Sequence, residues 1–257
     1  GCDAVEVLDS QSVRIGAKVF REGDYLSING STGNVYEGDL PVVESEIIQV
    51  IQGKLDAKKS DKYQRFALIL SWADSVRTLH IRANADVPDQ AKIARGFGAE
   101  GIGLCRTEHM FFAEDRILIM QKMILARTKE EREKFLDQLL PLQKQDFIGL
   151  YREMAGYPVT IRLLDPPLHE FLPKREDLMV EIAQLELTGS DGARLEEKRR
   201  LLARVEELHE FNPMLGLRGC RRGITMPEIT RMQARAIMEA ACELAKEGKK
   251  IVPEIMI

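Results

Sequence analysis

The feature that most constrains the fold is an alternation of short apolar strands with helical stretches after Val76. Strand-like segments are expected at 79–82, 101–106, 159–164, 214–218 and 251–257. Helical sequence separates them, near 88–97, 114–127, 129–154, 176–187, 194–209 and 227–246. This alternation favours a parallel α/β sheet with covering helices, whose strands are buried on both faces. A doubly wound sheet and a barrel both satisfy the pattern.

The sequence before Val76 has a different character. The first forty residues predict short β-strands joined by glycine-containing turns, as in Gly23–Gly30 and Thr32–Gly38. From Glu44 to about Ala73 helix formers dominate, interrupted by Gly53 and a polar stretch at 56–62. We therefore expect a β-rich part at 1–40, a helical linker at 41–76 and an α/β domain at 77–257.

Charge and cysteine content exclude several function classes. The chain has 37 basic and 41 acidic residues and a formal net charge of −4, so broad nucleic-acid or membrane-surface binding is not expected. The sequence lacks an apolar run long enough to span a bilayer. Its four cysteines are scattered without a CxxC pair, which indicates neither a zinc site nor a disulfide framework and favours a reducing compartment such as the cytoplasm.

Arginines recur at the predicted ends of four strands, at Arg82, Arg106, Arg162 and Arg218. In a parallel barrel such ends form the mouth that carries the chemistry, so these side chains are expected to converge on one pocket. Clustered guanidinium groups favour a polyanionic ligand, which they can grip with paired hydrogen bonds. The alternative is that each arginine pairs with a nearby carboxylate at the rim, for example Arg106 with Glu108 or Arg162 with Asp165.

Two other motifs suggest functions that their context does not support. The segment Gly96–Gly101 satisfies GxGxxG, but it follows a helix and precedes a strand, whereas a dinucleotide-binding fingerprint needs the opposite order. We expect Gly96 or Gly98 to end the helix in a left-handed conformation. Arg221 and Arg222 are expected on a solvated helix start rather than at a nucleic-acid interface.

Two histidines and two cysteines lie beside the strand-end arginines. His109 and His169 are expected to be hydrogen-bonding anchors, with ligand contact as the alternative. Cys105 and Cys220 are expected to be small buried residues rather than nucleophiles. A phosphate-binding GxxxxGK[ST] loop is absent from the sequence.

Several longer motifs resemble the pyruvate, phosphate dikinase family. The segments that carry the resemblance are Gly98–Phe112, Thr160–Phe171, Arg82–Asp86, Glu210–Arg221 and Val252–Ile257. They span Thr78 to Ile257, while residues 1–40 resemble the tail of the family's phosphohistidine domain and 41–76 the linker after it. The resemblance implies the beginning of a (β/α)8 TIM barrel, about five of its eight units, preceded by the β-rich tail of a swivelling domain.

The resemblance also implies a reaction and a set of site residues. The family interconverts ATP, phosphate and pyruvate with AMP, pyrophosphate and phosphoenolpyruvate (PEP) through a phosphorylated histidine. Arg106 and Arg162 would hold the phosphoryl group, Asp165 would help to position the site, and Arg218 would face the same pocket. Phosphoryl transfer depends on positioning and charge neutralisation, which suits such a cluster.

Other parts of the family's machinery are not recognisable in this sequence. The phosphorylatable histidine motif and the Mg²⁺ ligands find no match, and Glu254 does not fit the metal ligand's motif. Because the chain starts at Gly1 and stops within an apolar run at Ile257, we expect an internal segment that is inactive alone. Its partners would be phosphoenolpyruvate or pyruvate and the upstream phosphohistidine and nucleotide-binding domains of a homodimeric parent, with Mg²⁺ bound by residues beyond Ile257.

Two alternative functions remain open at this point. A chain that kept the arginine pocket without the catalytic parts could be a non-enzymatic module that senses phosphoenolpyruvate or another anion. A segment of a sister enzyme, either phosphoenolpyruvate synthase or phosphotransferase-system enzyme I, would share the arginine layout and differ in its phosphate acceptor.

Overall fold

The computed structural model describes residues 5–189, 192–209, 212 and 214–257. The chain divides into two compact units, residues 1–64 and residues 65–257. The division falls inside helix α2 (Asp61–Val76). Each unit is described by itself below.

The first unit contains two small antiparallel sheets, as the β-rich composition of its sequence predicts. Strands β1 (Val5–Asp9), β2 (Ser12–Ile15) and β3 (Lys18–Arg21) form one sheet, and β4 (Leu26–Asn29) pairs with β5 (Asn34–Glu37). Helix α1 (Glu46–Ile51) and a 3₁₀ turn (Ala57–Lys59) follow before α2 begins. None of the described strand residues in this unit is buried, so these hairpins do not build a core of their own.

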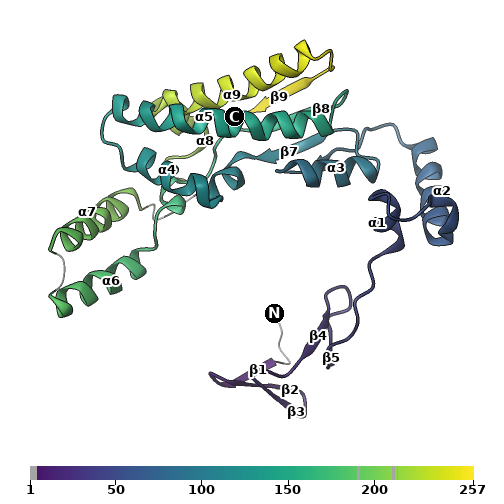
Figure 1. Cartoon of the computed structure of the whole chain (residues 1–257), viewed down its shortest axis with the longest axis horizontal. Coiled ribbons are helices and arrows are strands. Elements are labelled where there is room, and N and C mark those ends of the chain that lie inside the picture. The colour runs from purple at the N-terminus through teal and green to yellow at the C-terminus, as the bar shows by residue number, and fades with distance from the viewer. Residues whose placement is uncertain (1–4, 190–191, 210–211, 213) are drawn as a thin grey trace. The chain divides into compact units, whose positions relative to one another are not determined.

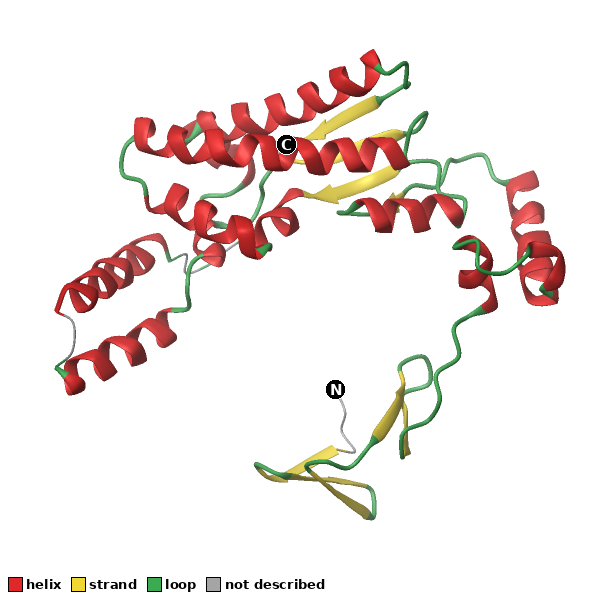
Figure 2. Ribbon diagram, viewed as in Figure 1, coloured by secondary structure: helices red, strands yellow, loops and turns green. Residues whose placement is uncertain are grey.

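The second unit is built on a four-stranded parallel sheet with the order β6 (Ala83–Asn84), β7 (Ile102–Arg106), β8 (Pro158–Arg162) and β9 (Val252–Met256). Figures 1 and 2 show the helices that connect and cover it. These are α3 (Pro88–Gly96), α4 (Glu114–Leu125), α5 (Lys129–Glu153), α6 (Arg175–Thr188), α7 (Gly192–Leu208), α8 (Gly219–Thr225) and α9 (Pro227–Lys246). The mixed α/β class with a parallel sheet is confirmed.

Local sequence signals fix where the helices begin and end. The Thr128 side chain accepts a hydrogen bond from the Glu131 N–H while the Glu131 carboxylate caps the Thr128 N–H, which starts α5 with a capping box. Pro227 occupies the first position of α9, where no N–H is needed. Gly98 follows α3 with φ of 93°, so the GxGxxG segment is a helix end, as predicted.

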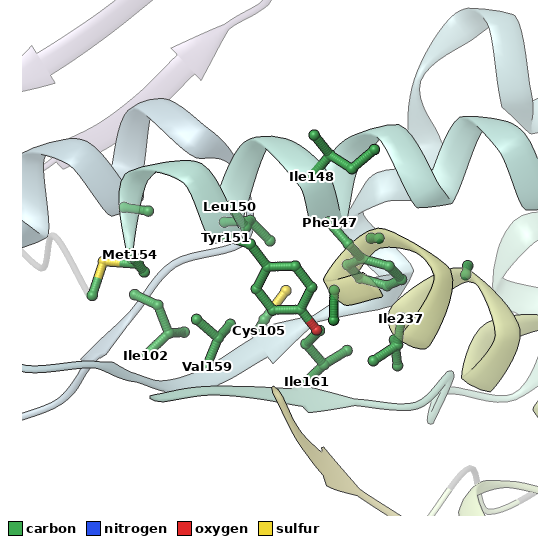
Figure 3. Packing of buried hydrophobic residues seen from close by; sticks show 14 of the residues in the cluster. Ile102, Cys105, Phe147, Ile148, Leu150, Tyr151, Met154, Val159, Ile161 and Ile237 are labelled. Atoms are coloured by element: carbon green, nitrogen blue, oxygen red, sulfur yellow. The ribbon is translucent and has the colours of Figure 1, made fainter. Parts of the chain in front are cut away.

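The main core lies between one face of the sheet and helices α5 and α9 (Figure 3). Along β8 the buried residues alternate, with Val159 and Ile161 in this core and Pro158, Thr160 and Arg162 half-buried on the other face. The expectation of strands buried on both faces is therefore wrong for the described residues.

A second core supports the segments that follow β7 and β8. It joins α4 and α5 to the loop after β8, through residues such as Met120, Leu139, Leu168 and Phe171. Phe171 stacks on Phe112, with ring centroids 4.9 Å apart. The long loops at this end of the sheet are thus anchored by apolar packing. Among the described residues, no helix has the length and apolar character to cross a membrane.

Two of the five expected strands differ from the structure. The segment 214–218 contains turns rather than a strand, because β8 pairs directly with β9 over five residues and leaves no position between them. The expected strand at 79–82 is shifted to Ala83–Asn84. The described sheet consequently has four strands where five barrel units were expected.

Candidate functional site

Arg106 and Arg162 end two neighbouring parallel strands. They are register partners across β7 and β8, and Arg162 is also opposite Met256 of β9. Parallel strands place their carboxyl ends at one edge, so both arginines start from the same edge of the sheet, as predicted. The Arg106 N–H donates a 2.6 Å hydrogen bond to Asp86, while its half-buried guanidinium makes no hydrogen bond or ion pair with another described residue.

Arg162 is held by two carboxylates. Its Nη2 donates to Oε1 of Glu108, which is 6% exposed, and its Nη1 lies 3.4 Å from Oδ2 of Asp165. Its Nε and the second Glu108 oxygen are buried without a hydrogen bond in the described structure. The alternative pairing of Arg162 with Asp165 is therefore present. The expected pairing of Arg106 with Glu108 is wrong, because Glu108 pairs with Arg162.

Asp165 joins Arg162 to Arg218. Arg218 precedes α8 and donates to both Asp165 oxygens, from Nε at 3.2 Å and from Nη2. This hydrogen bond, helped by the charge of Arg162, holds the pKa of Asp165 below its ordinary value, and the same contact raises the pKa of Arg218. Arg162, Asp165 and Arg218 are thus brought together as the sequence predicts, with Asp165 ionised between two cations.

Arg222 is a buried member of this cluster that the sequence did not reveal. It was expected on a solvated helix start, but its side chain is 2% exposed. Its Nη1 donates to the Pro166 carbonyl, and its Nη2 is buried without a partner in the described structure. Burial lowers the pKa of Arg222 to about 10, although the charge of Asp165 opposes that shift. Arg221, in contrast, is exposed and donates to the Gly216 carbonyl.

A cavity of about 460 Å³ opens beside these residues, at the carboxyl ends of β8 and β9. Arg162, Asp165 and Arg222 supply charge to its wall, and Ile229, Met256 and Ile257 supply apolar surface. Such a mixture of a few converging polar groups with apolar surface is typical of small-molecule sites. Here the guanidinium groups of Arg162, Arg218 and Arg222 share the carboxylates of Glu108 and Asp165, and this excess of positive charge favours an anionic ligand.

Cys105 and Cys220 differ in their surroundings. Cys105 is fully buried, as predicted, and burial raises the pKa of its thiol. Cys220 was expected to be buried, but it is exposed and lines the cavity. Its position at the start of α8, after the turn at 214–218, explains the difference because this helix covers the cavity rather than the core.

Arg82 does not join the cluster, although it was expected to. It precedes β6 and bonds Thr160 at 3.2 Å and the carboxylate of Glu254 on the half-buried face of the sheet. His109 lies 2.7 Å from Asp86 through Nδ1, in agreement with an anchoring role. His169 lies against His209, with ring centroids 5.4 Å apart, and its Nδ1 is buried without a partner in the described structure.

The residues present do not fit a metal ion. Among the described residues, no group of three or more His, Cys, Asp or Glu side chains is placed to hold one. The carboxylates nearest the arginines, Glu108 and Asp165, already accept hydrogen bonds from them. Glu254 is likewise bound to Arg82 and Thr160.

The chain is similar over its whole length to pyruvate, phosphate dikinases from Mesembryanthemum crystallinum (51% identity, a chloroplastic protein), Entamoeba histolytica (50%) and Clostridium symbiosum (47%). It covers 25%, 28% and 27% of those proteins, respectively, so it spans about a quarter of the length of the relatives it matches.

The family model for the PEP-binding domain of PEP-utilising enzymes matches residues 60–257. This stretch contains all four strands of the parallel sheet and every residue of the arginine cluster. The chain therefore belongs to the family of PEP-utilising enzymes, and residues 60–257 correspond to their PEP-binding domain.

Proposed function

We propose that this chain binds phosphoenolpyruvate at the edge of the sheet where β7 and β8 end. The observation that carries the proposal is that Arg106 and Arg162 are register partners. Their side chains therefore extend from the ends of two neighbouring strands. The guanidinium of Arg106 makes no ion pair or hydrogen bond with another described residue, so its charge is available to a ligand. Arg218 adds a third cation, fixed by Asp165.

The reaction that this site serves is the interconversion of ATP, phosphate and pyruvate with AMP, pyrophosphate and PEP. The proposal is supported by the names of the relatives, which are pyruvate, phosphate dikinases. In that reaction Arg106, Arg162 and Arg218 neutralise the phosphoryl charge and hold it in place, which lowers the barrier because phosphoryl transfer depends on electrostatics and positioning. The charged Asp165 keeps two of these arginines oriented.

The same proposal covers the wider organisation. Residues 77–257 form the first part of a (β/α)8 barrel, residues 1–40 the tail of a swivelling phosphohistidine domain, and residues 41–76 the linker between them. The partners are the phosphohistidine and nucleotide-binding domains of the same enzyme, which acts in the cytoplasm as a homodimer. Mg²⁺ belongs to this proposal as a cofactor of the whole enzyme and is not assigned to residues of this chain.

Titration of the 257-residue chain with PEP tests the site directly. We expect binding that is weaker than micromolar, because no metal ligands in the described structure assist the arginines. Arg106→Met should weaken PEP binding about tenfold or more, since a hydrogen bond between charged groups contributes about 1.5–3 kcal/mol. Arg235→Met is the matched control, because Arg235 is paired with Glu239 on the surface of α9.

The outcomes separate the alternatives. Equal loss of affinity in both variants, or no PEP binding by the unchanged chain, would overturn the proposal. Binding of inorganic phosphate as tightly as PEP would point instead to a general anion sensor, because a site built for PEP also contacts the carboxylate.

A further inference from the structure

A buried polar bridge connects helix α9 to the ends of β7 and β8. Gln233 of α9 is 1% exposed and uses both ends of its amide. Its Oε1 accepts a 2.8 Å hydrogen bond from the Leu164 N–H, and its Nε2 donates at 3.1 Å to Oγ1 of Thr107. The Thr107 hydroxyl in turn donates at 3.0 Å to the Arg162 carbonyl.

The groups that Gln233 and Thr107 bond lie at, or next to, residues of the arginine cluster. Thr107 follows Arg106, the carbonyl acceptor belongs to Arg162, and Leu164 precedes Asp165. The bridge therefore connects backbone groups at and just beyond Arg106 and Arg162, the last paired residues of β7 and β8. Because Thr107 and Gln233 are both fully buried, water does not compete for these bonds, and losing one partner leaves the others unsatisfied.

We propose that Gln233 is a positioning residue, which acts with Thr107 to set the places of Arg106, Arg162 and Asp165 for the bound anion. This inference rests on the proposed function, since PEP is the ligand whose binding reports the arginine positions. Gln233 also lines the cavity, but Oε1 and Nε2 of its amide each already bond a protein partner, so its effect on the ligand passes through the strand ends.

The pair Thr107→Val and Thr107→Ser provides the sharpest test. Valine keeps the shape of threonine and lacks the hydroxyl, whereas serine keeps the hydroxyl and lacks the methyl group. If the bridge positions the arginines, Thr107→Val weakens PEP binding by the 257-residue chain about tenfold and Thr107→Ser binds nearly as well as the unchanged chain. If Thr107 acts only by filling space, Thr107→Ser weakens PEP binding more than Thr107→Val does, and that result overturns the inference.

Gln233→Met supplies an independent variant of similar volume, with Ile237→Val as its control in the core on the next turn of α9. We expect Gln233→Met to weaken PEP binding about as much as Thr107→Val, and the double variant to lose little more, because the two groups belong to one bridge. In Gln233→Met the Leu164 amide should also exchange faster with solvent, while Ile237→Val leaves that amide and the PEP affinity unchanged.

Full PEP affinity in Gln233→Met, at temperatures where it is folded, overturns the inference and leaves the proposed function standing. Failure of the unchanged chain to bind PEP overturns both. Additive losses in the double variant also contradict a single bridge.

Discussion

Arg218 donates hydrogen bonds to both carboxylate oxygens of Asp165, and it does so 53 residues along the chain from its partner. The contact connects the loop after β8 to the start of α8, on either side of the α6 and α7 hairpin. It also places one negative charge between Arg218 and Arg162. Repulsion between these two guanidinium groups is thereby offset without a ligand.

Asp165→Asn should remove the negative charge that lies between Arg162 and Arg218. We expect the free energy of unfolding to fall by about 1–3 kcal/mol, because two partly buried arginines and the nearby Arg222 lose their counter-charge. Inorganic phosphate should then stabilise the variant more than the unchanged chain, since the anion replaces the missing charge. Urea denaturation with and without phosphate measures both effects. Asp137→Asn, at an exposed position on α5, is the control, and an equal response in both variants would contradict the prediction.

Arg222 offers a test of what a buried charge contributes. Arg222→Leu should leave the free energy of unfolding within about 1 kcal/mol of the original, because an apolar side chain of similar size removes the cost of burying a cation. Arg222→Ala should lose about 2–4 kcal/mol, because it leaves a cavity beside α8. Urea denaturation compares the two variants. A loss of about 2–4 kcal/mol in the leucine variant as well would contradict the prediction and show that the charge itself is needed.

The free energy of unfolding of the second unit should fall at acid pH, because Glu100 becomes protonated there. A hydrogen bond from Arg77 lowers the pKa of Glu100 from 4.5 to about 2, and His80 and the Ile81 N–H add to the effect. The folded chain therefore holds fewer protons than the unfolded chain between these values, so this contribution is complete above about pH 4.5 and is lost as the pH falls towards 2.

Urea midpoints measured at pH 5 and pH 3 test this contribution. The midpoint should drop less in Glu100→Gln than in the unchanged chain, since the variant has no carboxyl group to protonate at this position. Glu130→Gln, at an exposed position of α5, should behave like the unchanged chain. An identical drop in Glu100→Gln and in the unchanged chain would contradict the assignment.

The cysteines should report ligand binding by their reactivity. Cys220 and Cys242 are exposed and should be alkylated in the folded chain, whereas Cys105 should react after unfolding, because burial keeps its thiol protonated and covered. Cys220 lines the cavity, so PEP should slow its alkylation while Cys242 on α9 serves as an internal control. Mass spectrometry of the labelled peptides measures each site. Equal protection of both residues would indicate a general change rather than binding in the cavity.

Much of the secondary structure could be predicted from local sequence. The helices α3, α5 and α9 begin at a proline or a capping threonine, which act through their immediate neighbours. The strands β7, β8 and β9 are short apolar runs bounded by turns, and their order after long helices favours a parallel sheet. The arginines at the ends of β7 and β8 followed from the same pattern.

The errors have a common physical cause. The segment 214–218 has the apolar character of a strand, but a strand forms only where a sheet edge is free to pair with it, and β9 occupies the place beside β8. Arg82 and Arg106 look alike in sequence, yet the first is drawn to Glu254 across the sheet. Arg222 lies one residue after the exposed Arg221 and is buried because the α8 turns carry it towards the Pro166 carbonyl.

The sequence by itself determined the α/β class, most helix positions, the resemblance that names the ligand, and the identity of Arg106, Arg162, Asp165 and Arg218 as site candidates. The tertiary structure decided which arginines share an edge, which carboxylates restrain them, and that Gln233 connects α9 to both strand ends. The reason is that helix caps and turns depend on near neighbours. The ion pair of Arg218 with Asp165 and the hydrogen bond of Gln233 with Thr107 join residues 53 and 126 positions apart, and such partners are set by how the elements pack.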